Sequence, residues 1–91
     1  MAQVLMTLKV FPTDVERDLS QLKTEIEKTL YNKARIHSFE EEPIAFGLTA
    51  LITRVIFPEA EEGRQEDIEN ALRRLPSISE LQIIGSSRIS T

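Results

Sequence analysis

The 91-residue sequence contains no cysteine, which excludes disulfide bridges and thiolate metal sites. Its one histidine, His37, cannot build a histidine-rich metal centre. Glycine is also scarce, and Gly47, Gly63 and Gly85 are too scattered to form either glycine-rich phosphate-binding loop. We therefore expect no metal, no cofactor and no nucleotide site on this chain. The lack of cysteine is typical of a protein of the reducing cytoplasm, where we expect this one.

The sequence also lacks long apolar runs and an excess of basic residues. No stretch approaches the roughly 20 apolar residues that span a bilayer, and the first residues lack the features of a signal peptide. With 15 acidic against 11 basic residues the net charge is −4, a balance that repels phosphate backbones. Aromatic residues make up only 5% of the chain, and the base-stacking pattern of RNA-recognition domains is missing. We expect no membrane association and no direct contact with nucleic acid.

What is present is periodic hydrophobicity over the whole length. A chain this short forms one core, so residues 1–91 are expected to be a single domain. Alternating apolar residues predict strands at residues 4–11, 34–42, 45–57 and 78–84, and residues 85–91 are interpreted as a tail of small residues. Helical spacing predicts two amphipathic helices, one through Leu19, Leu22, Ile26 and Leu30, the other through Ile68, Ala71, Leu72 and Leu75. Thr13 and Asp18 are alternative caps for the first helix.

This order, β-α-β-β-α-β, predicts an α+β, ferredoxin-like fold with both helices on one face of an antiparallel sheet. The expected strand order is 4-1-3-2, which puts the two most apolar strands in the centre. The same topology places the loop with Pro43 and Phe46 at one end and Arg88 at the other. About seven strand residues separate them, or roughly 20–25 Å, so they cannot form one active site.

The residues offer little for catalysis. Ser86 and Ser87 have no histidine nearby in the sequence, and His37 is interpreted as a partly exposed strand residue. The run of acidic residues 40–42 could hold a hard cation, but side chains of one strand alternate between faces, so a solvated acidic rim is the favoured interpretation. We expect no catalytic residue, no metal ligand and no enzymatic activity.

The segment EEPIAFGLTAL, residues 41–51, resembles the signature of the archaeal elongation factor 1-beta family. The resemblance covers essentially the whole chain, including LKVFP near the start and Ser87-Arg88-Ile89 near the end. It implies a ferredoxin-like exchange factor that binds the GDP form of the GTPase elongation factor 1-alpha and speeds GDP release. It also implies that Phe46 enters a pocket on a second domain of the GTPase, while Arg88 is aimed at the magnesium site, where relatives usually carry lysine. The partner-binding residues expected from the resemblance are Pro43, Ile44, Phe46, Gly47, Arg88 and Ile89.

Without that resemblance, the same residues have simpler interpretations. Phe46 and Gly47 fit a core aromatic beside a β-bulge glycine, and Arg88 fits a solvated charge in a tail. The alternative function is a regulatory or oligomerising ferredoxin-like domain that binds a small ligand between paired sheet edges. That alternative predicts a stable dimer, whereas the exchange factor is expected to be a monomer when free.

Overall fold

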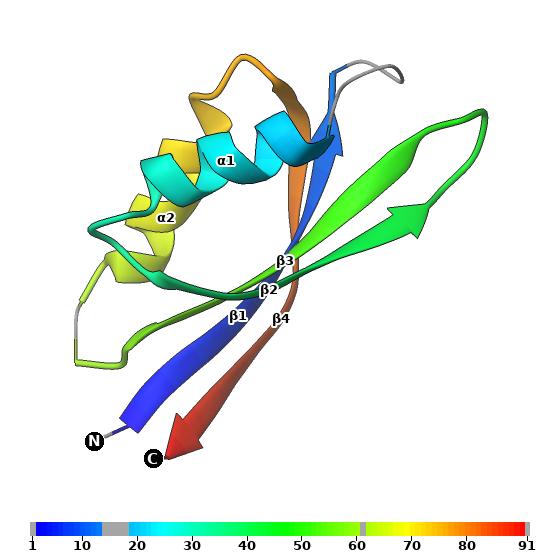
Figure 1. Cartoon of the computed structure of the whole chain (residues 1–91). Coiled ribbons are helices and arrows are strands. Elements are labelled where there is room, and N and C mark those ends of the chain that lie inside the picture. The colour runs from blue at the N-terminus through cyan, green and yellow to red at the C-terminus, as the bar shows by residue number, and fades with distance from the viewer. Residues whose placement is uncertain (1, 14–18, 61, 91) are drawn as a thin grey trace.

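The computed structural model describes residues 2–13, 19–60 and 62–90. Four antiparallel strands form one sheet in the order β2-β3-β1-β4, and two helices cover one of its faces (Figure 1). The elements along the chain are β1 (Ala2–Pro12), α1 (Leu19–Thr29), β2 (Arg35–Pro43), β3 (Thr49–Pro58), α2 (Arg64–Arg73) and β4 (Ile78–Ser90). The expected ferredoxin-like fold and the 4-1-3-2 strand order, counted from the other edge, are confirmed.

The central strands are the two that the sequence makes most apolar. On the side of the sheet that faces the helices, Met6 pairs with Val55 and Val10 with Leu51, and all four side chains are fully buried. Strand β3 also buries Ile52 on the opposite face, where no helix covers it. A strand that is buried on both faces must lie inside the sheet, because an edge strand would leave much of this apolar surface in water.

The helices contribute one apolar stripe each to the core. Helix α1 buries Leu22 and Ile26, and α2 buries Ile68 and Leu72, all four fully. The remaining helix positions are mostly polar, so each helix has the amphipathic pattern expected from the sequence. Both candidate caps of the first helix involve residues 14–18, which lie outside the described part of the chain.

Two sequence predictions about strand ends are wrong. The last strand does not stop at Ile84 but continues to Ser90, and its final residues pair with the first half of β1, from Met6↔Ser86 to Ala2↔Ser90. Strand β3 occupies only one edge of that half of β1, so the other edge needs a partner for its backbone groups. The third strand begins at Thr49 rather than at residue 45, because the chain reverses direction over residues 44–48.

Candidate functional site

The first part of the candidate site is the tip of the β2–β3 hairpin. The N–H of Leu48 donates to the carbonyl oxygen of Ala45 at 2.9 Å, which closes a four-residue turn with Phe46 and Gly47 at its centre. Both central residues have positive φ, 54° at Phe46 and 78° at Gly47. Positive φ at both positions is the pattern of a type I′ turn, whose twist matches that of the strands it joins.

The turn leaves apolar side chains in water. Phe46 is 98% exposed and Ile44, just before the turn, is 43% exposed. Pro43 ends β2 and is also exposed. The interpretation of Phe46 as a core aromatic is therefore wrong, because the left-handed turn carries its side chain away from the sheet. An apolar tip of this kind is typical of a surface that contacts another molecule.

The second part of the candidate site is Arg88, near the end of β4. Its backbone pairs with Val4 of β1, and its side chain is 70% exposed. Its Nε lies 2.7 Å from a carboxylate oxygen of Glu59, in the loop that follows β3. The interpretation of Arg88 as a charge in a tail is wrong, since the residue belongs to a paired strand. The neighbouring Ile89 is half-buried and pairs with Gln3.

The hairpin tip and Arg88 lie at opposite ends of the sheet. Val4 pairs with Arg88 on one side and with Phe57 on the other, so these three residues share one level of the sheet. Thr49 precedes Phe57 by eight residues on β3, a distance of roughly 26 Å. Phe46 lies beyond Thr49, in the turn of the β2–β3 hairpin. In Figure 1 this turn is far from the end of β4, which lies beside the N-terminus. The separation is larger than expected because eight residues of β3 and the turn, rather than seven strand residues, lie between the two levels.

The acidic run 40–42 is exposed, as expected of a solvated rim, but its carboxylates are paired. Each carboxylate forms an ion pair with a base on a neighbouring element, and the pairs are Lys9–Glu42 at 3.0 Å, Lys23–Glu41 at 3.6 Å and Arg54–Glu40 at 3.7 Å. Glu41 points to the helix side, where it meets Lys23 of α1, while the other two pairs lie on the uncovered face of the sheet. Within the described residues, no three acidic or histidine side chains gather as a metal would require.

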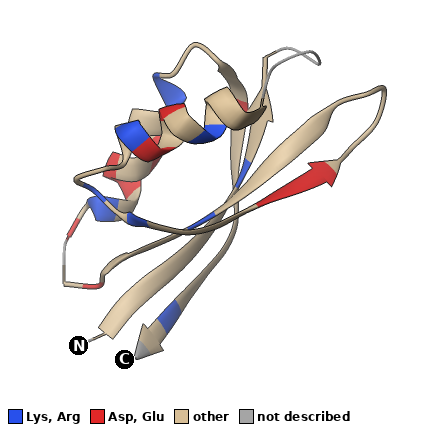
Figure 2. Ribbon diagram, viewed as in Figure 1, with Lys and Arg blue, Asp and Glu red and all other residues tan. Residues whose placement is uncertain are grey.

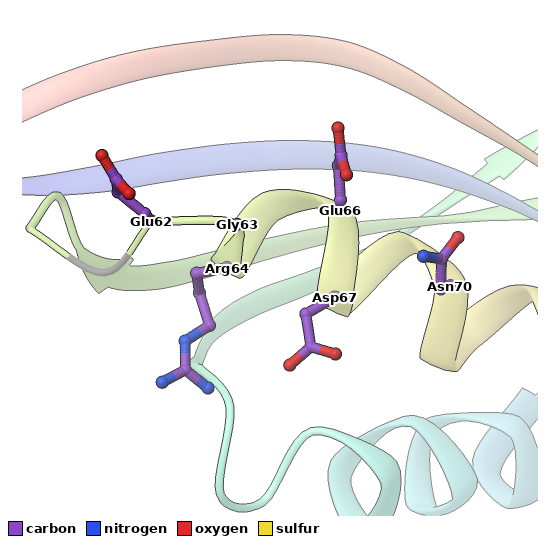
Figure 3. Close-up of a pocket in the computed structure, with 6 residues that line it drawn as sticks. All are labelled: Glu62, Gly63, Arg64, Glu66, Asp67 and Asn70. Atoms are coloured by element: carbon purple, nitrogen blue, oxygen red, sulfur yellow. The ribbon is translucent and has the colours of Figure 1, made fainter.

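A hollow of about 340 Å³ lies beside the beginning of α2, but it does not resemble a nucleotide site. It is lined by Glu62, Gly63, Arg64, Glu66, Asp67 and Asn70. Figure 3 shows that Glu62 and Glu66 project to one side of the helix while Arg64 and Asp67 project to the other, so the side chains do not converge. The carboxylates in the lining would also repel phosphate groups.

Figure 2 shows charged residues along both helices and along β2. Arg88 belongs to the last part of β4, where it pairs with Glu59. Among the described residues, no helix has the length and apolar character needed to cross a membrane.

Solved structures with a similar backbone differ widely in sequence. The C-terminal domain of the MgtC protein from Mycobacterium tuberculosis aligns with a TM-score of 0.63 at 11% identity, over 89% of this chain and 84% of that one. The ACT domain of GTP pyrophosphokinase from Chlorobium tepidum aligns with a TM-score of 0.57 at 10% identity, over 98% and 89% of the two chains. At this level of identity the likeness concerns the fold alone.

Sequence comparison is more specific. A model of the EF-1 guanine nucleotide exchange domain matches residues 5–89. The elongation factor 1-beta of Staphylothermus marinus is 40% identical over 99% of this chain and 100% of its own length. That of Desulfurococcus amylolyticus is 39% identical over the same shares of both chains. This chain therefore belongs to the elongation factor 1-beta family of guanine nucleotide exchange factors in translation elongation.

Proposed function

We propose that this protein binds elongation factor 1-alpha in its GDP form and accelerates the release of GDP, so that GTP can replace it. The observation that carries the proposal is that one small rigid module presents an exposed aromatic at one end and an exposed cation at the other. In this function the protein is no enzyme and needs no cofactor, because the reaction is an exchange of ligands on its partner. It acts as a monomer that forms a one-to-one complex.

Phe46 would supply binding energy. Its whole side chain is available, because it is 98% exposed in the free protein. Transferring an aromatic side chain of this size into an apolar pocket contributes about 2–3 kcal/mol. The ring stands on a short turn closed by a backbone hydrogen bond, so little freedom of the backbone is lost on binding. Ile44 and Pro43, exposed beside it, would widen the same contact.

Arg88 would act on the nucleotide site of the GTPase. GDP is held there by a phosphate-binding loop and by a Mg²⁺ ion that neutralises phosphate charge. A guanidinium placed about 4 Å from that ion repels it by several kcal/mol in partly buried surroundings. With the ion displaced, the phosphate contacts weaken and GDP leaves faster. The half-buried Ile89 would keep the end of β4 in place beside β1.

The test is the release rate of fluorescently labelled GDP from elongation factor 1-alpha, measured against the concentration of this protein. Arg88→Ala should lower the maximal rate at least tenfold, because the side chain acts on the metal rather than on binding. Phe46→Ala should raise the half-saturating concentration about tenfold or more and change the maximal rate little. Full activity of Arg88→Ala would exclude the metal-displacement role.

Matched controls come from the same fold. Tyr31 is 88% exposed in the turn after α1, and Arg35 is an exposed strand arginine on β2. Tyr31→Ala and Arg35→Ala remove an aromatic ring and a guanidinium away from the hairpin tip and from β4, since β2 and β4 are opposite edges of the sheet, and they should leave GDP release unchanged. A stable dimer with no effect on GDP release would instead favour a regulatory ferredoxin-like domain.

A further inference from the structure

Arg88 does not extend freely into solvent but is held by a second residue. The carboxylate of Glu59 lies 2.7 Å from Nε of Arg88, although the two residues are 29 positions apart in the sequence. Strand β1 lies between β4, which carries Arg88, and β3, which leads into Glu59, since β3 and β4 pair with opposite edges of β1. The ion pair therefore crosses β1 at the end of the sheet where Arg88 is presented.

Both partners of this ion pair are fixed by the backbone. Glu59 follows Pro58, which pairs with Gln3, and the N–H of Glu59 donates to the carbonyl oxygen of Ala2 at 3.3 Å. Arg88 is fixed by its pairing with Val4. The backbones of both residues are thus held, so the ion pair joins two side chains that start from fixed positions. An exposed arginine side chain otherwise samples many rotamers, and ordering them costs free energy on binding.

The nitrogen that Glu59 contacts is the one closest to the backbone. A guanidinium carries an N–H at Nε and further N–H groups on its two terminal nitrogens. A carboxylate that accepts from Nε leaves terminal N–H groups available and fixes the plane in which they lie. A lysine could not bind the carboxylate with one nitrogen and leave others available, because its single ammonium would pair with the carboxylate.

We propose that Glu59 is a positioning residue for Arg88: it holds Nε and thereby aims the terminal nitrogens at the nucleotide site of the GTPase. This rests on the function proposed above for Arg88. The contact is largely exposed, with 70% of the Arg88 side chain and 41% of the Glu59 side chain accessible. Exposed ion pairs stabilise a fold very little, so the effect of Glu59 should be on exchange and not on folding.

The first experiment compares Glu59→Ala with Glu59→Gln. Loss of the acceptor in E59A should lower the maximal rate of GDP release about two- to fivefold, the effect expected of one exposed pair, while the half-saturating concentration and the unfolding midpoint stay unchanged. E59Q keeps an oxygen that accepts from Nε and should stay closer to the wild-type rate. E62A is the matched control, because Glu62 is an exposed acid of the same loop and forms no ion pair with Arg88 within the described structure.

The opposite results are equally clear. Faster release by both E59A and E59Q would show that Glu59 masks the charge of Arg88, which overturns the proposal. A rate loss that is matched by a lower unfolding midpoint, or that is equal in E62A, would show a structural or general charge effect and would also overturn it.

The second experiment exchanges arginine for lysine. Arg88→Lys should slow release in the presence of Glu59, because the carboxylate engages the only ammonium. The double variant E59A/R88K should then be faster than R88K alone, although each single change is damaging. A double variant that is slower than both single variants would contradict the proposal. R88A is measured in the same series. If R88A is as active as the wild type, the function proposed for Arg88 is wrong. If R88A is inactive but E59A is not impaired, only the positioning role of Glu59 is wrong.

Discussion

At the scale of single residues, Phe46 has a backbone conformation that disfavours any side chain larger than that of glycine. A φ of 54° places a bulky aromatic in the left-handed region, where the Cβ of an L-residue costs about 1–2 kcal/mol. Asparagine or glycine would fit the first central position of this turn with less strain. A strained residue whose side chain also gains no burial contributes nothing to folding, and this is the pattern found where a side chain serves binding.

Phe46→Gly should therefore stabilise the free protein while it weakens the complex. Relief of the left-handed strain is expected to raise the free energy of unfolding by about 1 kcal/mol. Urea denaturation followed by circular dichroism measures this change, and the titration of GDP release measures the loss of binding.

Gly47→Ala is the converse control for Phe46→Gly. Its φ is 78°, and a Cβ added there would meet nothing within 4 Å, so any loss of stability reports backbone strain and not a clash. A loss of about 1 kcal/mol is expected. If Phe46→Gly lowers stability instead, the ring makes a stabilising contact in the free protein and the strain argument is wrong.

At the scale of elements, sequence periodicity was a good guide wherever a side chain faces the core. The strands and helices are predictable because each has apolar residues spaced at its own period. Met6, Leu22, Val55 and Ile68 are buried examples, one from each of four elements. The second half of β4 was missed for the same reason. Its glycine, serines and Arg88 show no apolar alternation, and this half is held in place by pairing with β1 rather than by burial.

Removal of residues 86–91 tests whether the end of the chain is an unpaired tail or a paired part of β4. A tail could be deleted without effect, whereas loss of the paired half of β4 leaves one edge of β1 open from Ala2 to Met6. With roughly 0.2–1 kcal/mol for each lost cross-strand pair, the free energy of unfolding should fall by about 2 kcal/mol. Arg88→Ala is the control, since it keeps the strand and should retain wild-type stability. An unchanged urea midpoint in the truncated protein would contradict the pairing.

The candidate site was predictable only in part. The resemblance pointed to Phe46 and Arg88, but from the residues alone each had a simpler interpretation that the structure overturns. Whether Phe46 is exposed depends on two positive φ values that hydrophobic periodicity does not encode. Glu59 was missed completely, because its contact with Arg88 requires β3 and β4 to lie on either side of β1, and no local spacing in the sequence signals it.

At the scale of the whole molecule, the proposed function would use the sheet as a spacer between the hairpin tip and Arg88. The molecule is elongated, with principal extents of 42, 21 and 18 Å, and the strands run between its ends. The core side chains of β1 and β3, such as Leu8 and Val55, are fully buried between the ends and hold the strands against the helices. Interlocked cores of this kind deform little. The distance between Phe46 and Arg88 is therefore set before the partner is met.

The separate roles proposed for Phe46 and Arg88 predict how each affects the coupling between GDP binding and binding of this protein to the GTPase. If the protein weakens GDP binding to the GTPase, GDP must weaken binding of the protein by the same factor. A coupling of about 4 kcal/mol corresponds to roughly a thousandfold change in each affinity. Calorimetric titration of the GTPase, with and without GDP and Mg²⁺, gives both affinities.

The two variants should change different quantities in that titration. Phe46→Ala should weaken binding to both forms of the GTPase by a similar factor and leave the coupling intact, because Phe46 lies at the opposite end of the sheet from Arg88. The Arg88→Ala variant should bind the nucleotide-free form nearly as tightly as the wild type does. It should bind the Mg²⁺–GDP form more tightly, because the repulsion between the guanidinium and Mg²⁺ is gone. If Phe46→Ala reduces the coupling as strongly as Arg88→Ala, the two ends do not act separately, and a rigid spacer is the wrong description of the sheet.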